Sequence, residues 1–174
     1  MEMMNAHQES VKQFIELASG SKIPVRPEIP DKKVRLLCAQ LILEEMRETI
    51  AALGYDVRYD NLDAGLYLVE TNPVDIIEVA DGIADSHYVL SYAACKFGIR
   101  EQPIQEEVNL NNLKKFDNWS KAELDMYKEY EYTVTKLANG YWCVKDKNGK
   151  VQKPPTHKKP DIKALLELQG WTQS

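Results

Sequence analysis

Two predicted helices, at about 32–53 and 73–97, carry acidic residues on the same side as apolar residues, and this pattern restricts the fold more than any other feature. At about 100° per residue, the acidic residues of the first helix fall within about 60° of Leu41. Those of the second helix fall within about 60° of Glu78. They are Glu44, Glu45 and Glu48 in the first helix, and Glu78, Asp81 and Asp85 in the second. Because the opposite sides of both helices are also apolar, neither helix has a wholly solvated charged face.

Such a cluster of carboxylates needs compensating positive charge, because acids three or four residues apart repel each other and are costly to bury. A hard divalent cation such as Mg²⁺, with Mn²⁺ as a substitute, prefers carboxylate oxygens. Di-iron bundles also pair carboxylate helices, but they require Glu-x-x-His, and the matching positions here are Ala51, Asp81 and Ala84. The cluster therefore predicts a magnesium site. The alternative is that the acids lie at a helix rim and pair with Lys32, Arg35 or Arg47.

The sequence as a whole predicts one domain. It has a helical core at 1–116, which contains the two acidic helices, and a C-terminal extension at 117–174 that belongs to the same domain. In the core we expect an amphipathic helix that ends at Gly20, a proline-rich strap, a loop with a short helical turn between the two acidic helices, and a further helix after Pro103. Asn72-Pro73 is the expected start of the second acidic helix.

The C-terminal part is rich in β-branched and aromatic residues between 130 and 154 and contains two Asn-Gly pairs. Asn-Gly is a preferred two-residue hairpin turn, so a small three-stranded β-meander is expected there. A short helix is expected to start near Asp161. The predicted class is therefore mainly α with a small C-terminal β-meander.

Composition excludes several classes of protein. The formal charge of -5, from 22 basic and 27 acidic residues, does not favour nucleic-acid binding. The three cysteines are odd in number and far apart, which is typical of reduced thiols. No apolar run has the length of a membrane span, and the first ten residues do not resemble a signal peptide. We therefore expect a cytoplasmic protein that binds neither membrane nor nucleic acid.

The pattern Glu44-Glu45-x-x-Glu48, followed by Glu78-x-x-Asp81, resembles the EExxE…ExxD pattern of the all-α nucleoside triphosphate pyrophosphohydrolases. That superfamily includes MazG, the dimeric dUTPases, the dCTP pyrophosphatases and phosphoribosyl-ATP pyrophosphohydrolase. The chain is similar, over nearly its whole length, to a small MazG-like branch of bacteria and their phages. "RLLCAQLILEE" and "EVADGIADSHYVLSYAACKFGI" resemble the two acidic helices of that branch, and "NGKVQKPPTHKKPDI" resembles its closing motif. His157 of the closing motif is expected to be exposed.

The resemblance implies a helical bundle that forms a homodimer or homotetramer and hydrolyses (deoxy)nucleoside triphosphates to the monophosphate and pyrophosphate with magnesium, in nucleotide-pool housecleaning. It implies Glu45, Glu48, Glu78 and Asp81 as metal ligands. The implied catalytic residues are Glu44, Glu45 and Glu48, with Glu44 as general base or a further ligand. The implied substrate-binding residues are Asn112, Lys115, Lys153 and Asp85; for Asp85, an ion pair with a lysine across the subunit interface is an equal alternative. Two other functions stay open, namely phosphoribosyl-ATP hydrolysis and a non-catalytic nucleotide sensor.

Overall fold

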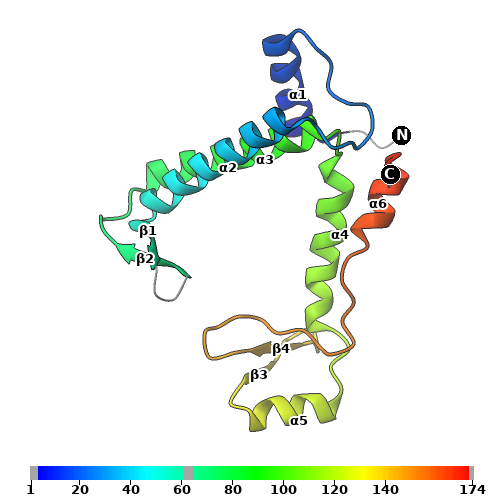
Figure 1. Cartoon of the computed structure of the whole chain (residues 1–174). Helices are drawn as coiled ribbons and strands as arrows, with labels where there is room; N and C mark the ends of the chain where they lie inside the picture. The colour runs from blue at the N-terminus through cyan, green and yellow to red at the C-terminus, as the bar shows by residue number, and fades with distance from the viewer. Residues whose placement is uncertain (1–3, 61–64, 173–174) are drawn as a thin grey trace. The chain divides into compact units, whose positions relative to one another are not determined.

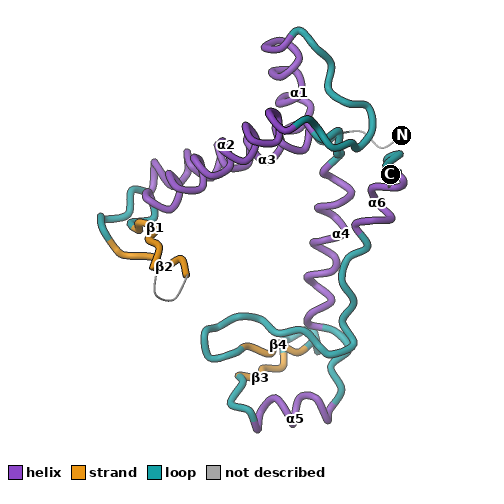
Figure 2. The backbone as a smooth tube through the Cα atoms, in the orientation of Figure 1, coloured by secondary structure: helices purple, strands orange, loops and turns teal. Residues whose placement is uncertain are grey.

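The computed structural model describes residues 4–60 and 65–172, which form six α-helices and two small antiparallel sheets (Figure 1). Helices dominate the backbone and each sheet has two short strands (Figure 2). The predicted mainly α class is confirmed, whereas the predicted bundle is not. The chain divides into two compact units, one of Met1–Glu101 with Leu166–Ser174 and one of Gln102–Leu165. The predicted division after residue 116 stays a prediction.

The first unit begins with helix α1 (Ala6–Ser19). The Asn5 side chain caps its start by accepting a hydrogen bond from the Gln8 N–H, and Gly20 ends it with a φ of 67°, a conformation that glycine adopts without steric cost. The predicted helix and its stop at Gly20 are confirmed. The proline-rich strap at 22–30 has no regular secondary structure, as predicted.

Two long helices, α2 (Lys32–Ala52) and α3 (Ile76–Lys96), lie side by side (Figure 1). The predicted helices are confirmed, but the predicted start of the second at Asn72-Pro73 is wrong. Asp75 is the cap, because its side chain accepts hydrogen bonds from the N–H groups of Ile77 and Glu78.

An antiparallel hairpin of β1 (Tyr55–Asp60) and β2 (Gly65–Glu70) joins α2 to α3. The predicted loop with a helical turn is therefore wrong here. Alternation of apolar and polar residues along β1 is a strand pattern. The base of the hairpin is fixed to the end of α2 by hydrogen bonds from Thr71 N–H to the Gly54 carbonyl (2.8 Å) and from Asp75 N–H to the Ala52 carbonyl (3.1 Å).

The core of the first unit lies where α1 packs on the C-terminal half of α3. Val11, Ile15, Ile23 and Cys95 are buried there. These residues come from α1, the strap and α3, so burial of their apolar surface holds the three segments together.

Two buried glutamines bind the backbone directly after α3. Gln8 donates through Nε2 to the Ile99 carbonyl oxygen (2.7 Å) and accepts from the Glu101 N–H (3.2 Å). Gln169 accepts from the Arg100 N–H (2.7 Å) and donates to the Arg100 carbonyl oxygen (3.0 Å). We call this set of four hydrogen bonds the glutamine clamp.

The second unit contains most of α4 (Glu101–Leu113), the 3₁₀ turn η1 (Lys114–Phe116), α5 (Lys121–Glu129) and a hairpin of β3 (Thr133–Lys136) and β4 (Trp142–Lys145). Its small core is formed by Trp119, Leu124 and Val144. The predicted three-stranded meander is wrong in its third strand, because only an isolated bridge between Lys145 and Val151 follows β4.

Helix α6 (Ile162–Leu168) begins beside Asp161, as predicted, and the chain then returns to the first unit. Among the helices that the structure describes, none has both the length and the apolar character needed to span a membrane.

Candidate active site

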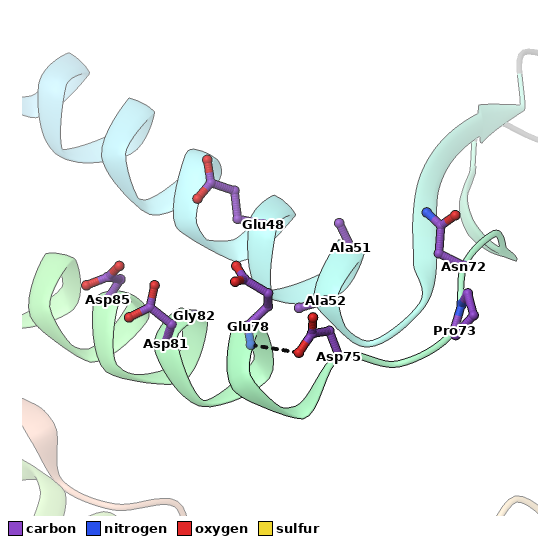
Figure 3. Close-up of a pocket in the computed structure, with 10 residues that line it drawn as sticks. All are labelled: Glu48, Ala51, Ala52, Asn72, Pro73, Asp75, Glu78, Asp81, Gly82 and Asp85. Carbon is purple, nitrogen blue, oxygen red and sulfur yellow. Dashed lines mark hydrogen bonds between the residues drawn. The ribbon is translucent and has the colours of Figure 1, made fainter.

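A pocket of about 400 Å³ lies between α2 and the N-terminal half of α3, and four of the predicted carboxylates line it. Glu48 comes from α2, whereas Glu78, Asp81 and Asp85 lie along the side of α3 that faces α2 (Figure 3). Asn72, Pro73 and Asp75 line the end towards the hairpin (Figure 3). We call this cavity the acidic pocket; among the described residues, no lysine or arginine lines it.

The two helices approach closely because small side chains meet between them. A Cβ on Gly82 would lie 2.7 Å from Thr49 Oγ1 and 3.1 Å from Thr49 Cα. The Thr49 hydroxyl also lies 3.1 Å from the Ser86 hydroxyl. Gly82 therefore does not leave open space on the acidic face, since Thr49 of α2 occupies it. This close packing brings Glu48 of α2 near the acidic side of α3.

The start of α3 positions Glu78. The Asp75 side chain accepts from the N–H groups of residues 77 and 78, which fixes the first turn of the helix. The partial positive charge at a helix N-terminus stabilises a carboxylate in the first turn, so Glu78 is placed where its negative charge is best tolerated.

None of the six acidic residues forms an ion pair within the described part of the chain, where the ion pairs are Lys12–Glu9, Arg58–Asp56 and Lys128–Asp125. The acidic residues therefore do not form the alternative ion pairs with Lys32, Arg35 or Arg47. The pKa of Glu45 is raised, first by partial desolvation and then by the negative charges of Asp85, Glu48, Glu44 and Asp81. Glu45 thus belongs electrostatically to the acidic cluster although it does not line the pocket.

Glu44 lies in a separate groove along α2, of about 430 Å³. Glu48 and Ala51 line both cavities, and Arg47 contributes a basic side chain to the groove alone. The structure therefore does not bring Glu44 into the acidic pocket, and Glu48 is the link between the two.

The donor set suits a hard divalent cation. The ionisable side chains that line the acidic pocket in the described part of the chain are all carboxylates, which Mg²⁺ and Mn²⁺ prefer, and none is a histidine or cysteine. Among residues 4–60 and 65–172, no three acidic, histidine or cysteine side chains converge closely enough to hold a metal ion as they stand. The ligands thus fit the ion in chemical type, and binding would require the carboxylates to move together.

The other predicted substrate-binding residues belong to the second unit, so their roles at the acidic pocket stay predictions. Asn112 is exposed on α4, Lys115 lies in η1, and Lys153 is exposed in the closing motif. The carbonyl oxygen of Lys115 accepts from Trp119 Nε1 (2.8 Å).

Beside Asn112, the buried Asn111 binds two residues of the closing motif. Its Nδ2 donates to the Lys158 carbonyl oxygen (2.8 Å), and its Oδ1 lies 2.9 Å from His157 Nε2. His157 is half-buried, so the expectation of an exposed loop histidine is wrong. The amide needs Oδ1 as acceptor, and His157 therefore carries its proton on Nε2.

Sequence reasoning missed Asp75 as a residue of the pocket. Asp75-x-x-Glu78 has the spacing of a helix cap followed by an acid three residues later, which is a recognised start signal. Asn72-Pro73, three residues earlier, is also a helix-start signal, and local sequence does not distinguish the two.

Comparison with protein families gives a match over residues 11–112 to PRA-PH, phosphoribosyl-ATP pyrophosphohydrolase. The matched residues cover more than half of the chain and include the six predicted acidic residues, Asp75 and Asn112. They end before Lys115 and Lys153. A search of curated proteins finds no match.

Proposed function

Because the chain belongs to the phosphoribosyl-ATP pyrophosphohydrolase family, within the MazG-like all-α pyrophosphohydrolases, we propose that it hydrolyses (deoxy)nucleoside triphosphates to the monophosphate and pyrophosphate. Members of this family are pyrophosphohydrolases that act on phosphoric anhydrides. The role we propose in the cell is the removal of unwanted nucleotides from the nucleotide pool.

The acidic pocket is the observation that supports this proposal. It gathers four carboxylates from two helices and no basic side chain, in a cavity of about 400 Å³. An anionic triphosphate would be repelled by such a pocket, so it must enter with compensating positive charge. A substrate that arrives as its magnesium complex meets this requirement.

We propose that Glu45, Glu48, Glu78 and Asp81 hold Mg²⁺, with Mn²⁺ as a substitute. When bound, the ion would supply charge neutralisation and polarisation of the phosphate oxygens. Glu44, outside the acidic pocket, would accept a proton from the attacking water or orient it. Asp85 lines the pocket beyond Asp81 and would contact the sugar or the ion.

We also propose Lys115, Lys153 and Asn112 as substrate-binding residues. Lys115 and Lys153 would bind phosphate oxygens by charge-assisted hydrogen bonds. Asn112 carries both a donor and an acceptor and would bind the sugar or base.

Phosphoribosyl-ATP is the second candidate substrate, because the matching family is described by that activity. Both candidates share the same bond cleavage, the release of pyrophosphate from an adenosine or other nucleoside polyphosphate. They differ in the group attached to the base, and the assay below distinguishes them.

We also propose a homodimer or homotetramer. Several large apolar side chains of α2 and α3 are solvent-exposed in the single chain, among them Leu43 (63 %), Ile76 (74 %) and Ile83 (51 %). An apolar surface of this kind is typical of an interface. Ile83→Asp should shift the protein from oligomer to monomer in analytical ultracentrifugation, whereas an unchanged mass would contradict the involvement of this face.

The function is tested by turnover of a panel of ribo- and deoxynucleoside triphosphates and of phosphoribosyl-ATP with Mg²⁺, with separate detection of pyrophosphate and orthophosphate. We expect pyrophosphate and the monophosphate, and loss of turnover in Glu48→Gln. Glu28→Gln is the matched control, because Glu28 is an exposed acid of the strap outside the pocket.

Turnover of phosphoribosyl-ATP alone would contradict nucleoside triphosphates as substrates and would support phosphoribosyl-ATP instead. Nucleotide binding without turnover of any compound would favour the sensor alternative. Orthophosphate as the product, or full activity of Glu48→Gln, would refute the proposed role of the acidic pocket.

A further inference from the structure

The few basic residues of the first unit are unevenly distributed. This unit has 10 basic against 18 acidic residues. Three of the basic residues, Lys12, Lys22 and Arg100, nevertheless line one cavity of about 340 Å³. It is bounded by α1, the proline-rich strap and the residues that follow α3, and it shares no lining residue with the acidic pocket. We call it the basic pocket.

The cations of the basic pocket are not fully neutralised by the protein. Lys12 binds Glu9 at 2.7 Å, and this hydrogen bond is the main cause of the raised pKa of Lys12. In the described residues neither Lys22 nor Arg100 forms an ion pair. Glu16, the one acid among the described residues that line the cavity, accepts a hydrogen bond from the Ile23 N–H at 3.4 Å. Two cations therefore remain to attract an anion from solution.

The walls of the basic pocket are already formed. Gly98 has a φ of 66°, and a Cβ on it would lie 2.2 Å from the Arg26 carbonyl oxygen, so the strap passes directly over the end of α3. The Glu28 N–H binds the Phe97 carbonyl oxygen at 3.0 Å. The glutamine clamp fixes the backbone of Arg100 independently of its side chain.

The side-chain chemistry of the pocket indicates the kind of ligand. Arg100 Nη2 lies 3.5 Å from the Val25 carbonyl oxygen, which holds the guanidinium at the strap and leaves its other donors available. Arginine and lysine together suit phosphate oxygens. Ile23, Pro24 and Val25 add an apolar wall, which a free phosphate ion would not use. The volume is at the lower end of the range for small-molecule sites.

We propose that the basic pocket binds a small organic phosphate, without a divalent metal ion, at a site separate from the acidic pocket. A nucleoside monophosphate belongs to this class, and it is also the product of the proposed reaction. The choice of that probe rests on the proposed function, whereas the site itself does not.

The test is calorimetric titration of the full chain with adenosine 5′-monophosphate in the presence of EDTA. Lys22→Gln and Arg100→Gln should each weaken binding by about tenfold, since each removes a charge-assisted hydrogen bond. Lys33→Gln, which removes an exposed lysine of α2 outside the pocket, should leave the affinity within about twofold. Inorganic phosphate should bind more weakly than the monophosphate, because it cannot use the apolar wall.

Three results would overturn the proposal: no binding of the monophosphate at millimolar concentration, equal affinity of the two variants and wild type, or loss of binding in Glu48→Gln. Circular dichroism of each variant verifies that it is folded. The titration needs neither metal nor turnover, so failure of the proposed function would appear in the nucleotide assay and not here.

Discussion

Replacing Gln8 with leucine removes half of the glutamine clamp while preserving the size of the side chain. Gln8 is 0 % exposed, and its amide binds the Ile99 carbonyl oxygen at 2.7 Å and the Glu101 N–H at 3.2 Å. Leucine fills a similar volume but offers neither a donor nor an acceptor. The variant therefore isolates the cost of two backbone groups that lose their partners.

Each buried polar group left without a partner costs about 1–3 kcal/mol. Ile99 and Glu101 are only half-buried, so water can reach them in part. We therefore expect Gln8→Leu to lower the free energy of unfolding by about 2–4 kcal/mol. Gln8→Glu keeps the acceptor for the Glu101 N–H but directs a carboxylate oxygen at the Ile99 carbonyl. It should be more destabilising at neutral pH than at acidic pH, where the buried acid is protonated.

Urea denaturation followed by circular dichroism measures these free energies. Gln13→Leu is the matched control, because Gln13 is an exposed glutamine of the same helix and its replacement should change the free energy of unfolding by less than about 0.5 kcal/mol. Hydrogen exchange at the Glu101 amide should accelerate in Gln8→Leu. If Gln8→Leu were as stable as the Gln13 control, the clamp would contribute nothing and the reasoning would be refuted.

Two further predictions concern packing and thiol chemistry. Gly82→Ala should lower the free energy of unfolding by about 1–2 kcal/mol despite the better helix propensity of alanine, because its methyl group meets Thr49; thermal denaturation tests this, and a stabilised variant would contradict it. Burial first, and then the charge of Glu101, raises the pKa of Cys95 from 9.0 to about 11. The unfolded thiol ionises first, so this contribution to stability is present below pH 9 and is lost towards pH 11, by roughly 2–3 kcal/mol. Cys95→Ala should remove that part of the pH dependence in urea denaturation, and an identical pH slope in both proteins would be inconsistent with the shift.

The helices of the first unit could be predicted because each has an apolar stripe and a terminal signal. Asp31 caps the start of α2 by accepting from the Val34 N–H, and Gly20 ends α1. Both act on their own neighbours, so local sequence is sufficient to place these helix ends. Helix α5 also has a local signal, the capping box of Ser120 and Glu123, but its short length gives only a weak apolar periodicity.

Other features depend on contacts that local sequence does not encode. Gln8 and Gln169 bind backbone about 90 and about 70 residues away in the sequence, and such contacts have no periodicity that predicts them. A helical wheel places Glu44 and Glu45 about 100° apart, but only the packing of α2 on α3 assigns them to different surroundings. The acidic residues could thus be identified from the sequence, whereas the separation of Glu44 from the acidic pocket could not.

The return of the chain to its first unit has a consequence for how the protein is made. The ribosome finishes residues 102–165 before it finishes Leu166–Ser174, which supply Gln169 to the clamp around Arg100. The clamp around Arg100 can therefore form only after residues 102–165 have been synthesised, so the first unit cannot complete its hydrogen bonds before the chain of the second unit has been made. A nascent chain stalled before Gln169 should expose the segment after α3 to proteolysis, and release of the full chain should protect it.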